Sequence, residues 1–181
     1  PSIVIDSTTG TFTITVGNSI TKDRGTLTIA KTLSNPNGAT VPASYTVNYN
    51  CGLDTDGTTA LTGSRTIAVG TPATVSGIPT GNTCSVTEVA PTPIPGYTWG
   101  TVTYTPPSIV IGSTTGTFTI TVGNSITRDR GSLVLAKSLT GGPGGPAAYT
   151  GPFTIHWDCG TFGSGNATVS LGSPVTIPNI P

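Results

Sequence analysis

Hydrophobic and polar residues alternate in short runs along most of the chain, and Gly- and Pro-rich stretches separate the runs. Side chains of a β-strand switch faces with a period of two, so this alternation predicts strands that bury one face. No segment shows a helical period. We therefore predict an all-β fold of tandem Ig-like antiparallel β-sandwich modules. The strands of one module are expected near residues 26–33, 43–51, 60–69, 72–77, 83–90, 97–105, 108–112 and 116–126.

A long internal repeat sets the expected domain organisation. Residues 1–26 and 107–132 are nearly the same sequence and differ at only three positions. A repeat at domain length indicates a tandem array of one module. We expect a complete module over residues 23–128, the last strands of a preceding module over 1–22, and the first half of the next module over 129–181. The favoured interpretation is a section of a longer array. The alternative is a polymer contact in which residues 129–181 of one copy meet residues 1–22 of another.

Three polar residues fall on faces that are otherwise apolar. Lys31, Glu88 and Asn124 occupy inward positions on the first, fifth and last predicted strands of the module. A buried charge without a partner costs several kcal/mol or more. Asn18 and Lys137 stand at the equivalent positions of the neighbouring segments, so the inward Lys and Asn belong to the module pattern.

These residue types predict a specific reaction if they meet in the core. Desolvation lowers the pKa of a buried lysine and raises that of a buried glutamate, so both can be neutral. A neutral amine is a nucleophile, and a protonated Glu88 can polarise the Asn124 carbonyl and shuttle protons to departing ammonia. The product is an isopeptide bond between Lys31 and Asn124. The alternative is a hydrogen-bonded cluster with a plain Lys31–Glu88 ion pair.

Three runs carry a family resemblance: GTLTIAKTL (25–33), CSVTEVAPTPIPGY (84–97) and FTITVGN (118–124). Together they resemble the repeated Ig-like stalk domains of Gram-positive surface proteins, namely the collagen-adhesin B-type and pilin modules. The likeness extends to the Cys-containing variants of actinobacterial wall-anchored proteins. It implies that Lys31 bonds to Asn124 with help from Glu88, which would be catalytic only for this self-crosslinking. The paired cysteines are a departure, because the crosslinked adhesin modules usually lack them.

The chain has three cysteines, and two of them lie in the predicted complete module. Cys51 and Cys84 both face inward, which predicts a disulfide across the sandwich. Cys159 stands at the position equivalent to Cys51, and we expect it to be unpaired. One disulfide per module indicates an oxidising, extracellular setting.

The composition argues against several kinds of binding partner and of chemical activity. The net charge is zero and 8% of the residues are charged, which argues against binding to nucleic acid or an anionic membrane. No apolar run is long enough to span a bilayer. The single histidine, His156, falls on an outward face, and Asp54 and Asp56 resemble the start of a calcium loop without its later ligands. We expect no metal, no cofactor and no enzymatic activity apart from self-crosslinking.

The predicted function is therefore structural: a repeat of an extracellular bacterial stalk or fibre that provides reach and mechanical stability. The expected partners are neighbouring copies of the same module, joined head-to-tail, with side-by-side contact as a second arrangement that would build a filament. The alternative is an adhesive module that binds a host protein or a glycan, for which the sequence identifies no ligand.

Overall fold

The computed structural model describes residues 2–4, 10–112, 116–141 and 151–181 of the chain. These residues form an all-β structure, as predicted. Their only helical element is a single 3-10 turn, Gly160–Phe162, so no described helix is long and apolar enough to cross a membrane. The first nine strands are β1 (Arg24–Ser34), β2 (Tyr45–Leu53), β3 (Ala60–Ile67), β4 (Ala73–Pro79), β5 (Thr83–Glu88), β6 (Tyr97–Trp99), β7 (Thr103–Thr105), β8 (Ser108–Val110) and β9 (Phe118–Arg128).

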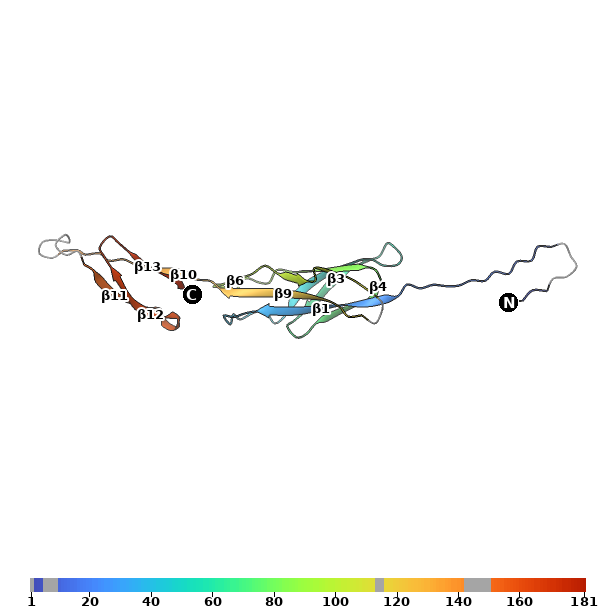
Figure 1. Ribbon diagram of the computed structural model, residues 1–181, viewed down its shortest axis with the longest axis horizontal. Coiled ribbons are helices and arrows are strands. Elements are labelled where there is room, and N and C mark those ends of the chain that lie inside the picture. Colours follow the sequence, from blue (N-terminus) through green and yellow to red (C-terminus); the bar gives the residue numbers. More distant parts are fainter. Residues whose placement is uncertain (1, 5–9, 113–115, 142–150) are drawn as a thin grey trace.

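These nine strands form two sheets that enclose one core (Figure 1). One sheet has the order β4-β1-β9-β6, with β7 also paired to β9, and the other has the order β3-β2-β5-β8. Alternate residues of each strand point between the sheets, which is what the period-two pattern requires. The residues at the centre of this core are Leu27, Ile29, Val47, Ile67, Ile78, Ile111, Ile120 and Val122.

The first and last of these strands are parallel neighbours. β1 pairs with β9 over eight positions, from Leu27 opposite Phe118 to Ser34 opposite Ser125. The other strand pairs of the sandwich are antiparallel, as predicted, and β1-β9 is the one parallel ladder among them. Because β1 and β9 run in the same direction, the chain enters the sandwich at one end and leaves it at the other (Figure 1).

One predicted strand is divided in two. The pattern predicts a single strand over residues 97–105, whereas the structure has β6 and β7 with an interruption at 100–102. Gly100 lies at this break, where its backbone N–H donates to the carbonyl of Ser125. A Cβ at Gly100 would overlap the Ser125 hydroxyl, so glycine permits this close approach of the loop to β9.

The residues after β9 form two small sheets. They contain β10 (Gly131–Leu135), β11 (Phe153–Asp158), β12 (Ser164–Val169) and β13 (Val175–Ile180), paired as β10-β13 and β11-β12. The β10-β13 pairing repeats that of β1-β4, and β11-β12 repeats β2-β3. Residues 10–23 lie on the other side of the sandwich and contain no strand (Figure 1). The division into modules after residues 22 and 128 stays a prediction.

Candidate functional site

Lys31, Glu88 and Asn124 are brought together inside the sandwich. Lys31 extends from β1 and Asn124 from β9 in one sheet, while Glu88 ends β5 in the other. Their exposed fractions are 4%, 8% and 8%, and they are the buried polar or charged residues among those the structure describes. All three therefore point inward, as the alternation predicts.

The Glu88 carboxylate bridges the other two side chains. The Lys31 ammonium donates to Glu88 Oε2 at 3.2 Å, and Asn124 Nδ2 donates to Glu88 Oε1 at 3.1 Å. In the β1-β9 ladder Lys31 lies opposite Val122 and Leu33 opposite Asn124, so Lys31 and Asn124 are diagonal neighbours. A side chain as long as lysine reaches a diagonal neighbour. The amine, the carboxylate and the amide therefore lie together at one buried site.

Aromatic side chains form one wall of this site. The Lys31 ammonium lies 4.4 Å from the centroid of the Tyr45 ring, a cation–π contact, and Tyr45 meets Trp99 edge-on at 6.3 Å. The backbone N–H of Glu88 donates to the Tyr104 hydroxyl at 3.0 Å, which anchors the end of β5. These aromatic groups exclude water from the ion pair and strengthen its electrostatic interaction.

Burial has the largest influence on the pKa of Lys31. Desolvation lowers the pKa of Lys31 below its usual 10.5, and the charge and hydrogen bond of Glu88 oppose that shift. Desolvation also raises the pKa of Tyr45, and the negative charge of Glu88 adds to this effect. Among the described residues, Asn124 Oδ1 is buried without a hydrogen-bond partner. A lysine with a lowered pKa loses its proton more readily and is then the nucleophile that amide exchange needs. Glu88 contacts Nδ2 of Asn124 and not its carbonyl oxygen, so the expected polarisation of that carbonyl by Glu88 is not present in this structure.

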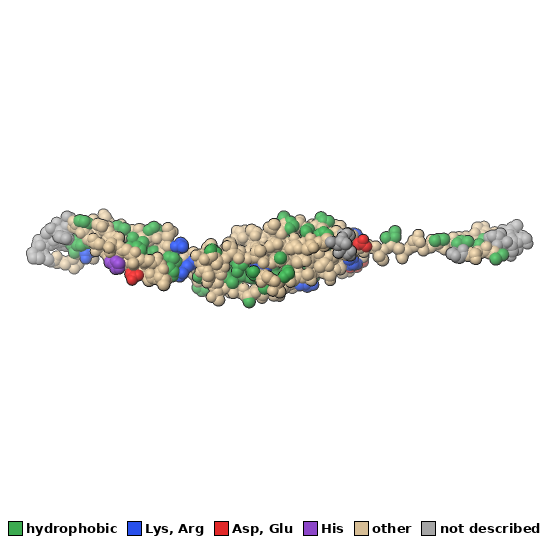
Figure 2. Space-filling view, turned by 60° about the horizontal axis from the view of Figure 1, so that its bottom comes forward, with side chains coloured by type: hydrophobic (Ala, Val, Ile, Leu, Met, Phe, Trp, Pro, Cys, Tyr) green, Lys and Arg blue, Asp and Glu red, His purple; other side chains and the backbone are tan. Residues whose placement is uncertain are grey.

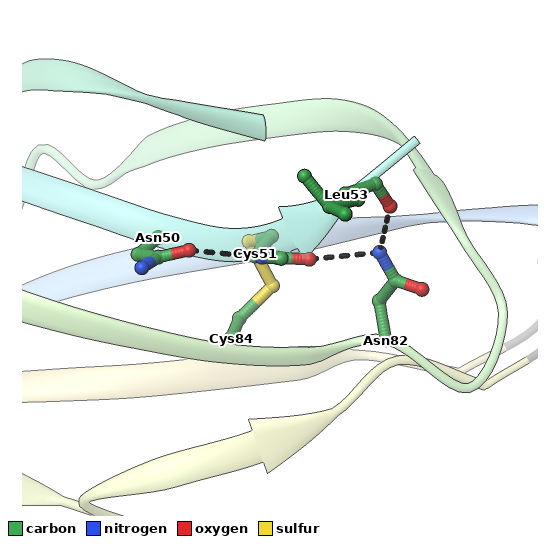
Figure 3. Close-up of a disulfide and its surroundings, with 6 residues drawn as sticks. Asn50, Cys51, Leu53, Asn82 and Cys84 are labelled. Carbon is green, nitrogen blue, oxygen red and sulfur yellow. Dashed lines mark hydrogen bonds between the residues drawn. A yellow bond between two sulfur atoms is a disulfide. The ribbon is translucent and has the colours of Figure 1, made fainter. Parts of the chain in front are cut away.

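The disulfide joins Cys51 and Cys84, both fully buried (Figure 3). The expectation that it crosses the sandwich is wrong, because β2 and β5 are neighbours in one sheet. Tyr49 pairs with Val86 and Asn50 with Ser85, and continuing this register by one residue places Cys51 opposite Cys84. This adjacency explains why their Cα atoms are only 4.0 Å apart, close to the short spacing of directly opposed residues in antiparallel strands.

Asparagine side chains hold the backbone around this disulfide (Figure 3). Asn82 Nδ2 donates to the carbonyls of Cys51 at 2.8 Å and Leu53 at 2.7 Å. The N–H of Gly52 donates to Asn50 Oδ1 at 2.9 Å. The disulfide and these hydrogen bonds tie the end of β2 to β5. Sequence reasoning missed this role of Asn82, whose only signal is its place two residues before Cys84.

The equivalent residues of the flanking segments are more exposed. Asn18 is solvent-exposed, and Lys137 is half-buried with its ammonium 5.2 Å from the Phe153 ring centroid. Cys159 is a half-buried free thiol. His156 lies on an exposed face beside Asn166, and the described residues contain no cluster of three or more metal-binding side chains.

The turn at Asp54 and Asp56 is held by its own hydrogen bonds. Asp54 forms an ion pair with Arg24 at 2.7 Å, and Asp56 accepts backbone N–H bonds from Thr58 and Thr59. The backbone N–H of Thr55, followed by Arg24, lowers the pKa of Asp54, and the hydroxyl and backbone N–H of Thr59, with the N–H of Thr58, lower that of Asp56. Both acidic residues are therefore engaged in a structural turn.

Comparisons with known proteins identify one family and several similar folds. A model of the family described as Domain of unknown function (DUF5979) matches residues 27–127. No curated protein matches the chain.

Among the solved structures that the chain is similar to are two adhesins and a pilin. An adhesin from Mobiluncus mulieris, which contains intramolecular disulfide, isopeptide and ester bond cross-links, is 22% identical over 57% of this chain and 41% of its own, with a TM-score of 0.36. The pilus-presented adhesin Cpa is 18% identical over 56% and 27%, with a TM-score of 0.35. The major pilin T-13 of Streptococcus pyogenes is 16% identical over 59% and 46%, with a TM-score of 0.22.

In each case, the aligned region spans less than half of the other protein's length. The family model, in contrast, matches more than half of this chain. The chain therefore belongs to the DUF5979 family.

Proposed function

We propose that the unit over residues 23–128 is a load-bearing module of an extracellular bacterial stalk or fibre. The parallel pairing of β1 with β9 carries this proposal. The chain enters the module through β1 and leaves through β9, so a pull on the two ends draws these neighbouring strands past each other. All the hydrogen bonds of the ladder then resist together, instead of opening one at a time.

We further propose that Lys31 and Asn124 form an isopeptide bond that locks this ladder. The neutral amine of Lys31 attacks Cγ of Asn124, the Cγ–Nδ2 bond breaks, and one ammonia molecule leaves as the new Nζ–Cγ amide forms. Glu88 accepts a proton from the lysine nitrogen and donates one to the departing Nδ2. Its two oxygens support these roles, because Oε2 faces Lys31 and Oε1 faces Asn124 Nδ2.

The proposed bond changes which part of the chain bears force. Force entering at Arg24 would pass along β1 to Lys31, cross to Asn124 and leave along β9. Residues 32–123 would then carry no load. The disulfide acts separately, because it joins β2 to β5 inside the other sheet and keeps the Glu88 strand in place.

The environment proposed for the module is outside the cell. The Cys51–Cys84 disulfide is typical of an oxidising compartment. Net charge is zero, so little electrostatic repulsion opposes contact between neighbouring copies. We propose head-to-tail association of modules as the main contact and side-by-side association as a second.

Intact-mass measurement of the whole chain tests the crosslink. Loss of ammonia makes the chain about 17 Da lighter than its disulfide-bonded sequence mass. Glu88→Gln and Lys31→Arg should each restore that mass, relative to their own sequences. The repeat supplies a matched control, since Lys137→Arg changes the equivalent lysine and should keep the mass loss. A wild-type chain at full mass would reject the bond.

Pulling experiments on single molecules test the load-bearing role. The crosslinked chain should show no extension from residues 32–123. Lys31→Arg should release residues 32–50 and 85–123 in one step, while the Cys51–Cys84 disulfide keeps the loop between them closed. If the adhesive alternative is correct, the chain should instead bind a glycan array or a host matrix protein with saturable affinity, and Lys31→Arg should leave that binding unchanged.

A further inference from the structure

An exposed segment near the N-terminus has the same sequence as a buried strand. Residues 10–21 and 116–127 are identical at all positions, and the second set contains most of β9. Val122 is fully buried in β9, whereas its counterpart Val16 is 76% exposed. Likewise, Ile126 is fully buried in β9, whereas its counterpart Ile20 is 96% exposed. The segment 10–21 thus carries the apolar face of a sheet strand without a sheet, and Figure 2 shows apolar side chains along this slender part of the molecule.

A matching sheet edge lies at the other side of the chain. β10 and the residues after it, GSLVLAKSL (131–139), correspond to GTLTIAKTL (25–33) of β1. β1 has two neighbours, β4 and β9, but among the described residues β10 pairs only with β13, the counterpart of β4. The edge that β9 occupies on β1 is therefore open on β10. Leu133 and Leu135 are only half-buried there, whereas Leu27 and Ile29 are fully buried.

The exposed segment cannot reach this edge within its own chain. The sandwich of residues 24–128 lies between residues 10–21 and β10 (Figure 1). Pairing with β1 of the same chain is also excluded, because β9 occupies that edge. A parallel neighbour would in any case need a crossover of about a dozen residues, and only Lys22 and Asp23 are available. Within residues 1–181 the strand and the edge cannot meet, so a contact between them joins two copies.

We propose that residues 10–21 of one copy add to β10 of a second copy as a parallel strand. The β1-β9 ladder sets the register: Phe12 opposite Leu133, Ile14 opposite Leu135 and Val16 opposite Lys137. This pairing covers the apolar face of both partners, and main-chain hydrogen bonds along an added strand supply affinity. The proposal specifies the contact of the head-to-tail assembly proposed above and rests on that function.

The contact generates an open fibre and no closed dimer. After the donated strand, Lys22-Asp23-Arg24 leads into β1, just as Arg128-Asp129-Arg130 leads from β9 into β10. The joint between two copies therefore repeats the joint inside one copy. Donor and acceptor surfaces differ, so the interface is heterologous, and a 181-residue copy that donates residues 10–21 still presents its own β10 edge to the next copy.

The register brings Asn18 near Lys137, as Asn124 lies near Lys31. Glu88, the one glutamate in residues 1–181, hydrogen-bonds inside the sandwich. Between two 181-residue chains we therefore expect a non-covalent joint that dissociates in denaturant, whereas the proposed crosslink inside each chain persists.

Sedimentation of the 181-residue chain over a range of concentrations tests the association. The wild-type chain should form assemblies that lengthen with concentration. Val16→Asp puts a charge on the inward face of the donated strand and should leave monomers, with at least a tenfold weaker association. Thr15→Asp places the same charge on the outward face and should assemble like the wild type. Both positions are exposed in the single chain, so neither change disturbs the sandwich.

Disulfide trapping tests the register. In a Cys159→Ser background, Thr13→Cys with Val134→Cys places two thiols directly opposite and should give ladders of linked chains under oxidation. Thr13→Cys with Ala136→Cys is shifted by two residues and should give few. Monomers at every concentration, equal assembly of the two Asp variants, or equal trapping of the two pairs would overturn the proposal. A monomeric chain that still lacks the mass of one ammonia would reject strand addition and leave the load-bearing proposal standing.

Discussion

Replacing Cys51 and Cys84 by alanine should destabilise the sandwich strongly. The two cysteines are 33 residues apart and close a loop of that size in the unfolded chain. Loop-closure entropy for such a loop corresponds to about 4 kcal/mol at 25 °C. Small domains are stable by roughly 5–15 kcal/mol, so the double variant should lose a large part of its stability. Loss of two buried sulfur atoms adds to the effect, because the surrounding core does not collapse fully around the space.

Urea unfolding is the appropriate assay, followed by Trp99 fluorescence in a Trp157→Phe background. Trp99 packs against Tyr45 in the sandwich, so its emission reports on that unit alone. The midpoint should fall, and the dependence of the unfolding free energy on urea should rise, because the unfolded chain without the disulfide is less compact and exposes more surface. Cys159→Ser is the control and should alter stability by less than about 0.5 kcal/mol, since it removes no bond. A loss below about 1 kcal/mol in the double variant would refute the loop argument.

Two further predictions concern β9 and the buried lysine. Gly123→Ala should lower the free energy of unfolding in urea by about 1–3 kcal/mol, because its Cβ would lie 2.5 Å from the Thr103 hydroxyl. Gly17 is the counterpart of Gly123 in the exposed segment and has no atom near its Cβ position, so Gly17→Ala should be neutral. Equal effects of the two changes would contradict this packing argument. In an Asn124→Ala background, where no crosslink forms, burial lowers the Lys31 pKa, so the unfolded chain binds more protons than the native one. The measured quantity is the free energy of unfolding of Asn124→Ala minus that of Asn124→Ala with Lys31→Met. This difference should rise as the pH approaches 10.5, and a difference that falls with pH would contradict the argument.

Strand faces were predictable because the period of two acts locally. The alternation around Lys31 and Asn124 places both inward, and the structure agrees. The same pattern does not say which sheet a strand joins. Cys51 and Cys84 were therefore correctly paired but wrongly assigned to opposite sheets.

Strand direction and interruption depend on distant residues. Nothing within β1 or β9 shows that they are parallel neighbours, because that follows from how the intervening strands distribute between two sheets. The break between β6 and β7 arises where Gly100 approaches Ser125 of β9. The crosslink chemistry remains a prediction from residue types and the geometry around Glu88.

The β1-β9 ladder also sets the order in which the module can fold. Leu27 pairs with Val75 on one side and with Phe118 on the other, so its second neighbour is synthesised 43 residues after its first. Contacts so distant in sequence form slowly, because a long loop must close before they contribute. Until β9 arrives, Lys31 stays hydrated and protonated on an open edge. An isopeptide bond would then form only after the last strand has docked. A module that contains the bond must therefore have completed its folding at least once.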